Sequence, residues 1–210
     1  MSENRIERPM PYQARRSQHV SQATSSSALS LRTHPLVFGV VVFLASELMF
    51  FGGLIAAYFN LRSLDSPWPP AGVTLDTVES SVGTFMLAVS SGTMLLSTHN
   101  LAKGNALMAR FWLGATILLG TAFEVIALHG WLKAPFRIDS HAYGTTFYAM
   151  TGFHFLHVLA GIVMLIMLFG AMHMAAFERD KRAGVEAIGF YWHFVFAVWV
   201  LIWGTIYFIK

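Results

Sequence analysis

Long apolar runs separated by short polar turns follow residue 33 of this chain. Within each run the apolar positions are continuous and do not alternate with polar ones, so the pattern predicts helices and excludes a β-barrel. A helix needs about 20 residues to cross a hydrocarbon core of about 30 Å. Five runs reach that length, so we predict an all-α, polytopic membrane bundle of five transmembrane helices. The predicted spans are 36–59, 78–98, 107–129, 143–173 and 187–209.

Polar segments divide the chain into two parts. Residues 1–33 are polar and rich in serine, and we predict a disordered cytoplasmic tail there. Residues 34–210 form the predicted transmembrane domain. The tail has no apolar core of the kind found in a cleaved secretory signal. Its arginine and serine content also suits a mitochondrial transit peptide, an alternative that Glu3 and Glu7 disfavour.

The lysines and arginines predict the orientation of the bundle. With the N-terminus inside, ten of these residues fall on inner segments and four on outer segments. Cytoplasmic segments of membrane proteins carry the excess of basic residues. The distribution therefore predicts an N-in, C-out topology.

Composition supports the membrane assignment and excludes several kinds of site. The chain is 55% hydrophobic and only 12% charged, whereas soluble domains contain about 25% charged residues. It has no cysteine, which excludes iron–sulfur clusters and thiolate-bound zinc or copper. The basic excess is concentrated in the tail, and no basic folded domain follows it. We therefore expect no nucleic-acid partner.

A few ionisable residues lie inside the predicted spans, where such groups are costly and often functional. At ~1.5 Å per residue, Glu47 lies roughly 17 Å and His157 roughly 24 Å from the inner ends of their helices. Tilt of the longer helix would bring the two to one level, where a carboxyl group needs neutralisation or a partner. His154 and Glu124 lie further out, and His193 lies near the inner surface.

The spacing of these residues leaves several interpretations open. His154 and His157, three residues apart, face about the same side of a helix. They could form a proton relay with Glu47, present two ligands to a metal or haem, or clamp a lipid headgroup. They could also simply hydrogen-bond helices together, an interaction worth about 0.6 kcal/mol on average in a membrane bundle.

Three segments together resemble a known family. They are LASELMFFGGLIAAYF (44–59), APFRIDSHAYGTTFYAMTGFHFLHVLAG (134–161) and FYWHFVFAVWVLIWGTIY (190–207). They resemble subunit III of haem–copper cytochrome c oxidases, and the likeness covers residues 34–210. With five predicted helices, the chain is similar to the short bacterial form that lacks the two N-terminal helices of the seven-helix version.

The resemblance implies a non-catalytic role in a terminal oxidase of the bacterial plasma membrane. Such a subunit binds no cofactor and no metal, and has no catalytic residues. It packs on subunit I, holds phospholipids, supports proton uptake and protects the oxidase from inactivation during turnover. Haem and copper are bound by the partner subunits I and II. The complex transfers electrons from cytochrome c, which docks through subunit II, to oxygen, and forms water with proton translocation.

The resemblance also assigns roles to particular residues. Glu47 matches the carbodiimide-reactive membrane glutamate of the family, and His157 matches the histidine expected beside it. Phe196 stands where the family usually has an aspartate, which removes a polar group one turn after His193. Beyond the resemblance, we predict that His154 and Glu124 support the pair. Contacts with lipid headgroups are predicted for Trp192, His193, Arg179 and Arg182.

Two alternatives remain at this stage. The near one is subunit III of a quinol oxidase, or the related accessory protein of nitric oxide reductase. The choice between cytochrome c and quinol as electron donor would be decided by whether the neighbouring gene for subunit II encodes copper-binding cysteines. The other is a self-standing transporter or di-haem membrane protein, which a haem absorption band or stoichiometric metal in the isolated chain would reveal. It would use Glu47, Glu124, His154, His157 and His193.

Overall fold

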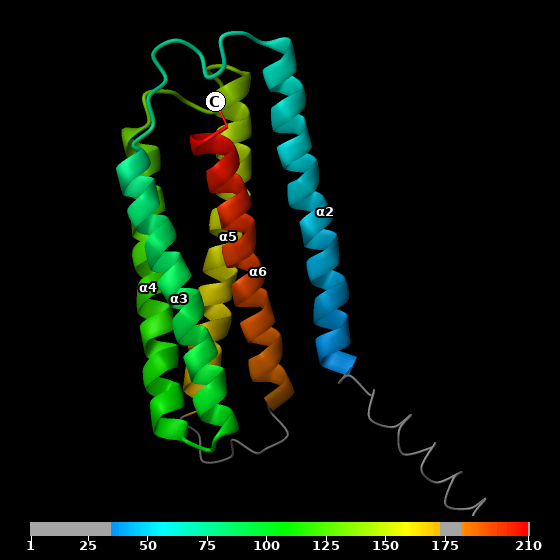
Figure 1. Cartoon of the computed structure of the whole chain (residues 1–210), viewed down its shortest axis with the longest axis vertical. Coiled ribbons are helices and arrows are strands. Elements are labelled where there is room, and N and C mark those ends of the chain that lie inside the picture. Colours follow the sequence, from blue (N-terminus) through cyan, green and yellow to red (C-terminus); the bar gives the residue numbers. More distant parts are fainter. Residues whose placement is uncertain (1–34, 173–181, 210) are drawn as a thin grey trace, which may run out of the picture. The chain divides into compact units, whose positions relative to one another are not determined.

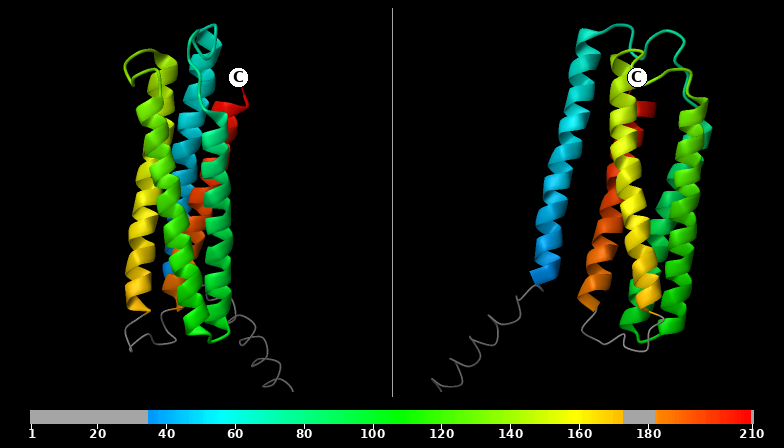
Figure 2. Two further views of the ribbon diagram at one scale, coloured as in Figure 1. Left: turned by 90° about the vertical axis from the view of Figure 1, so that its left-hand side faces the viewer. Right: turned by 180° about the vertical axis from the view of Figure 1, so that it is seen from behind.

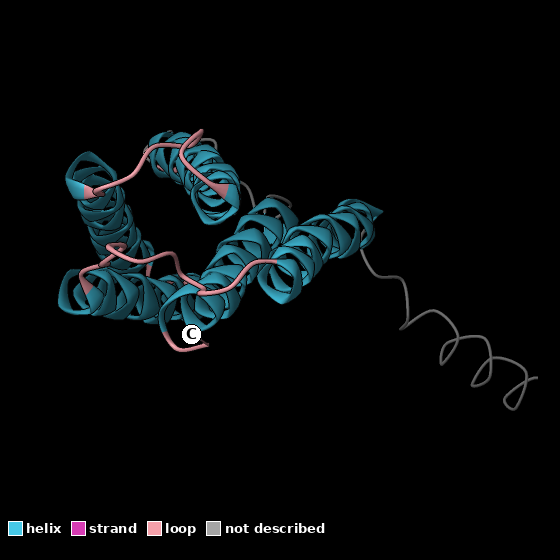
Figure 3. Cartoon of the chain, turned by 90° about the horizontal axis from the view of Figure 1, so that it is seen from above, coloured by secondary structure: helices cyan, strands magenta, loops and turns pink. Residues whose placement is uncertain are grey.

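The computed structural model describes residues 35–172 and 182–209, and over these residues it contains helices and loops without strands (Figure 3). The predicted five-helix membrane fold is confirmed, because all five helices are long and apolar enough to cross a membrane. The predicted tail lies outside the described residues, and the N-in, C-out topology stays a prediction. The helices are α2 (Pro35–Leu64), α3 (Thr77–Ala102), α4 (Ala106–Lys133), α5 (Ala142–Ala171) and α6 (Arg182–Tyr207).

Polar residues in the loops fix where three helices begin. Asp76 precedes α3 and accepts hydrogen bonds from the backbone N–H groups of Val78 and Glu79, both at 3.0 Å. Asn105 caps α4, and the Nδ1 atom of His141 caps α5 by accepting from the Gly144 N–H at 2.8 Å. Side-chain caps of this kind satisfy backbone donors that have no partner within the helix. They also explain why α3, α4 and α5 begin a residue earlier than the apolar pattern predicts.

Four of the helices pack in a ring. α3 packs on α4 and α6, and α5 packs on the same two helices. α2 flanks this ring (Figures 1 and 2) and is the least covered helix, with only 6% of its membrane-spanning window buried. Two of its side chains, Phe51 and Tyr58, are buried in the core. α2 therefore meets the ring through a few side chains and leaves most of its surface uncovered.

Trp192 of α6 sits at the centre of the ring between two glycines. A Cβ atom added at Gly120 of α4 would lie 2.7 Å from the Trp192 ring, and one added at Gly161 of α5 would lie 2.8 Å from it. Any side chain at either position would collide with the indole. These two glycines allow α4 and α5 to approach α6 closely, in the way that small residues do in membrane helix packing.

Hydroxyl groups on α3 connect it to α4. Ser90 Oγ donates to the Thr116 carbonyl oxygen at 3.1 Å, and Thr93 Oγ1 lies 2.9 Å from Thr116 Oγ1. Ser97 Oγ donates to the Ala109 carbonyl oxygen at 2.8 Å. These bonds replace hydrophobic driving force, which is absent between helices surrounded by lipid tails.

Candidate functional site

Glu47 of α2 and His157 of α5 meet through their side chains. Glu47 Oε2 lies 2.9 Å from His157 Nε2, within hydrogen-bonding distance. His157 Nδ1 lies 2.7 Å from the carbonyl oxygen of Phe153, one turn earlier on α5. The structure thus brings together the two residues that the sequence places at a similar depth, although they are 110 residues apart in the chain.

The hydrogen bonds of His157 define where the protons of the pair are. A carbonyl oxygen can only accept, so Nδ1 of His157 must carry the proton that is directed at Phe153. In a neutral imidazole Nε2 is then an acceptor, and the Glu47 carboxyl must donate to it. In the ionised form Nε2 carries the proton and the Glu47 carboxylate accepts it. Both arrangements share one proton between the groups and leave the pair without net charge.

Neighbouring side chains pack around the Glu47–His157 pair. The Phe51 ring, one turn after Glu47 on α2, contacts the His157 ring edge-on with a centroid distance of 5.1 Å. Tyr191 of α6 donates its hydroxyl hydrogen to the His157 carbonyl oxygen at 2.9 Å. α2 is therefore bound to the side chain of His157 and α6 to its backbone. His157 therefore connects three helices.

The Glu47–His157 pair is only partly covered by this chain. The exposed fractions of the two side chains are 21% for Glu47 and 18% for His157. On α2, Leu48, Met49 and Phe50 beside Glu47 are exposed to the surroundings. The pair therefore lies at an apolar surface rather than in the centre of the bundle.

His154 has a different environment from His157. It is buried, with 1% exposure, and its ring stacks on Trp199 of α6 at 5.0 Å and meets the edge of Phe123 of α4 at 5.9 Å. Three residues along a helix leave an angle of roughly 60° between side chains. This angle turns His157 toward α2 and His154 into the ring. The Phe51 ring contacts both histidines, at 6.5 Å from His154 and 5.1 Å from His157, but among the described residues the two share no hydrogen-bond partner.

Glu124 does not join the pair either. It lies in the interior on α4 with 7% exposure, and neither of its carboxyl oxygens has a hydrogen-bond partner among the described residues. The same holds for both ring nitrogens of His154. The supporting role predicted for His154 and Glu124 therefore involves no hydrogen bond between them or to the pair.

The residues predicted to contact lipid headgroups lie in different places. Trp192 is 1% exposed, and its indole N–H donates to Ser90 Oγ at 3.0 Å. Its prediction needs correction, because the ring fills the interior and its only donor is already bonded. His193 is half-buried, with Nδ1 2.6 Å from Ser91 Oγ. Arg179 lies outside the described residues, and Arg182 begins α6.

Sequence reasoning missed the polar residues of α3. Ser90, Ser91 and Thr84 each bond to α6, through Trp192, His193 and Trp199 respectively. The signal was present in the segment ESSVGTFMLAVSSGTMLLST, whose hydroxyl residues recur at helical spacing. These residues bind α3 to its neighbours.

Metal ligands are not clustered in the part of the chain that the structure describes. Over residues 35–172 and 182–209 no group of three or more histidine, aspartate or glutamate side chains lies close enough to hold an ion. A cluster of three ionisable side chains does occur, but it includes a lysine: Glu79 of α3 pairs with His129 and lies 3.5 Å from Lys133 Nζ. This ion cluster joins α3 to the end of α4.

Comparison with known proteins identifies the family. Residues 19–210 match the family described as "Cytochrome c oxidase subunit III". The chain is 34% identical over 197 residues to the "Probable cytochrome c oxidase subunit 3" of Mycobacterium bovis, covering 89% of this chain and 97% of that one. It is 30% identical to the "Cytochrome c oxidase subunit 3" of Thermostichus vulcanus, covering 89% and 94%. It is 35% identical to the protein of that name from Papio hamadryas, covering 82% and 69%. With the five membrane helices, these matches show that the chain belongs to the cytochrome c oxidase subunit III family.

Proposed function

We propose that this chain is a non-catalytic subunit of a bacterial cytochrome c oxidase and packs on subunit I in the plasma membrane. The observation that carries the proposal is the Glu47–His157 pair, which stays partly exposed on an apolar surface. A polar pair that faces a membrane is costly unless a partner or an ordered lipid covers it. Subunit I and phospholipids would supply that cover in the assembled oxidase.

The uncovered surface of α2 supports docking on a partner. Large apolar side chains on several sides of the helix are exposed, whereas among residues 37–64 only Phe51 and Tyr58 are deeply buried. A partner helix or bound lipid would complete the packing around α2. The exposed large apolar residues of α2 are Phe38, Val41, Val42, Phe43, Leu48, Met49, Phe50, Phe59 and Leu64.

The redox chemistry belongs to the partner subunits in this proposal. Electrons pass from cytochrome c through subunit II to the haem and copper of subunit I, where oxygen is reduced to water with proton translocation. The relatives named as cytochrome c oxidase subunits favour cytochrome c over quinol as the donor. The present chain contributes a helix surface, bound phospholipids and a proton-sharing pair. These support proton uptake and lasting turnover.

An N-in, C-out orientation completes the proposal. It places ten of the fourteen lysines and arginines on inner segments. Basic residues near the anionic headgroups of the inner leaflet contribute ~1 kcal/mol each. The end of α6 that begins at Arg182 and carries half-buried His193 would then face this surface.

Copurification tests the proposal. The chain is tagged in its own organism, and the membranes are solubilised in a mild detergent. We expect it to copurify with larger subunits that contain haem. Recovery of the chain as a stable, haem-free homo-oligomer from native membranes would contradict the proposal.

A further inference from the structure

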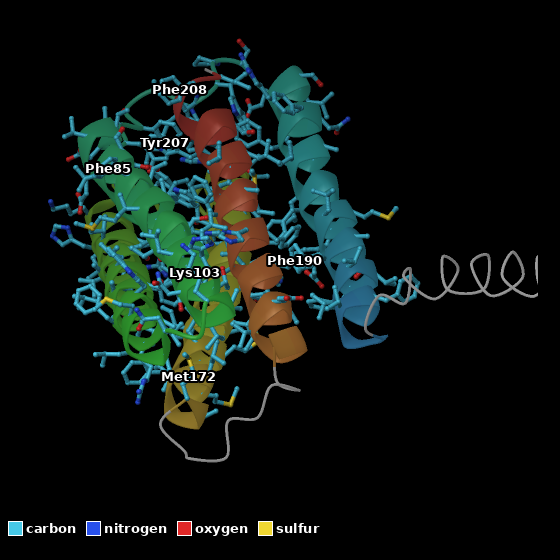
Figure 4. The ribbon with its side chains drawn as sticks, turned by 60° about the horizontal axis from the view of Figure 1, so that its bottom comes forward. Phe85, Lys103, Met172, Phe190, Tyr207 and Phe208 are labelled. Carbon is cyan, nitrogen blue, oxygen red and sulfur yellow. The ribbon has the colours of Figure 1, made fainter. Side chains whose placement is uncertain are left out.

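A cavity opens inside the four-helix ring at the end where α3 begins and α4 ends. Its volume is about 370 Å³, at the lower end of the ~300–1,000 Å³ typical of small-molecule sites. Lys133 and Tyr207 line the cavity near that end of the bundle. Figure 4 labels Tyr207 at this end and Met172 at the opposite end. Phe123 and His154 line the cavity further in. Lys133 lies ten positions after Phe123 on α4, a rise that gives the cavity a depth of roughly 15 Å.

His154 at the inner end has unused hydrogen-bonding capacity. It is 1% exposed, and neither ring nitrogen has a hydrogen-bond partner among the described residues. Stacking on Trp199 at 5.0 Å and edge contact with Phe123 at 5.9 Å fix the plane of its ring. A buried polar group without a partner destabilises the fold, so a ligand atom that bonds to it would be favoured.

The other residues that line the cavity indicate which kind of molecule fits. Trp131 donates its indole N–H to Thr151 Oγ1 at 3.2 Å, and Thr151 donates to the Phe147 carbonyl oxygen at 2.7 Å. These wall groups are already bonded and present mainly aromatic surface. At the rim, Glu79 is paired with His129 and Lys133. Asp76, also at this end, accepts hydrogen bonds from the backbone N–H groups of Val78 and Glu79, so both rim carboxylates already have partners within the fold.

We propose that this cavity binds a small, uncharged aromatic molecule carrying a hydroxyl or carbonyl group, with His154 as the hydrogen-bonding residue at its inner end. A neutral imidazole has one donor and one acceptor nitrogen. Its N–H can donate to a ligand carbonyl, and its unprotonated nitrogen can accept from a ligand hydroxyl. The ring of the ligand packs among the aromatic walls. The inference rests on this cavity alone and does not depend on the partner subunits proposed above.

Photolabelling of the purified oxidase in mild detergent with 4-hydroxybenzophenone tests the proposal. This probe carries both groups, and its light-excited ketone forms bonds with nearby C–H groups. Peptide mass spectrometry should find the label on cavity-lining segments of α4, α5 and α6. His154→Phe keeps the aromatic ring but removes the hydrogen bond. At subsaturating probe it should reduce labelling about fivefold, the factor that corresponds to ~1 kcal/mol.

Variants that fill the cavity provide the second test. A Cβ atom at Gly130, which lines the cavity, would meet no atom within 4 Å, so Gly130→Leu fills space without a backbone clash. It should abolish labelling of the cavity, and Ala127→Leu provides an independent filling variant. Gly170→Leu is the matched control, since its Cβ also meets nothing and Gly170 does not line the cavity. It should label like the parent. Labelling of the cavity segments that is unchanged in His154→Phe or in the filling variants would overturn the proposal.

Discussion

At the scale of single residues, the proton shared by Glu47 and His157 explains how a carboxyl group is accommodated at an apolar surface. The Phe153 carbonyl oxygen accepts from His157 Nδ1 at 2.7 Å, which directs Nε2 at Glu47. The pair then carries no net charge in either proton arrangement. A group that remains partly uncovered and can hold a proton is open to reagents dissolved in the membrane.

We therefore expect Glu47 to react with dicyclohexylcarbodiimide in the assembled oxidase. The reagent is hydrophobic and requires a protonated carboxyl in apolar surroundings. Peptide mass spectrometry should locate the adduct on Glu47, and Glu47→Gln should remove it. Exposed Glu186 of α6 is the internal control and should stay unmodified. Equal modification of Glu47 and Glu186 would contradict the special environment of the pair.

Two substitutions of Glu47 should distinguish the contribution of its hydrogen bond to stability from that of its charge. Glu47→Gln keeps the shape and an amide N–H that can donate to Nε2 of His157, so the complex should retain its stability. Glu47→Ala leaves Nε2 without a partner, a loss of about 1–3 kcal/mol. The measurement is the temperature at which this chain dissociates from the complex.

Ser46→Ala is the control for these substitutions. Ser46 is exposed next to Glu47, and its hydroxyl bonds only to the Phe43 carbonyl oxygen of its own helix at 2.7 Å. Dissociation temperatures that are equal for Glu47→Ala and Ser46→Ala would show that the pair does not hold α2 to α5.

At the scale of helices, Trp192 determines how closely α4, α5 and α6 approach. Gly161→Ala would place a Cβ atom 2.8 Å from the indole, so either the ring or the helix must move. Overpacking of this kind costs about 1–3 kcal/mol. We expect lower thermal stability and a change in tryptophan fluorescence.

Gly170→Ala on the same helix supplies the comparison. Its Cβ atom would meet no atom within 4 Å, so it should be neutral, or slightly stabilising because alanine favours helices. If Gly161→Ala were as stable as Gly170→Ala, the close packing around Trp192 would not matter for the fold.

The helices could be predicted from the sequence because continuous apolar runs have few other interpretations in a membrane. Depth made a Glu47–His157 contact possible, and the resemblance to the family selected it. Depth says little about direction around a helix, so it did not separate His154, which faces Trp199 and Phe123, from His157. The same limit made Trp192 look interfacial, although its neighbours Gly120 and Gly161 enclose it. Those neighbours come from other helices, and their position depends on packing.

At the scale of the whole molecule, the chain has the features of a subunit without its own redox centre. It contains no cysteine, and it belongs to the subunit III family. We expect the isolated chain to bind neither haem nor copper in stoichiometric amount. Optical spectra and metal analysis should show both in the intact complex and neither in the separated chain. About one haem or copper per isolated chain would contradict this expectation.

The central claim is that oxygen reduction occurs in the partner subunits while this chain sustains it. The most direct test is the time course of oxygen consumption by fully assembled complexes containing the parent chain, Glu47→Gln or Glu47→Ala. All three should start at the same rate per haem, because the proposal assigns the chemistry to the partner subunits. Glu47→Ala should lose activity after fewer turnovers than the other two. Loss of haem reduction from the first turnover in an assembled Glu47→Gln complex would contradict the account.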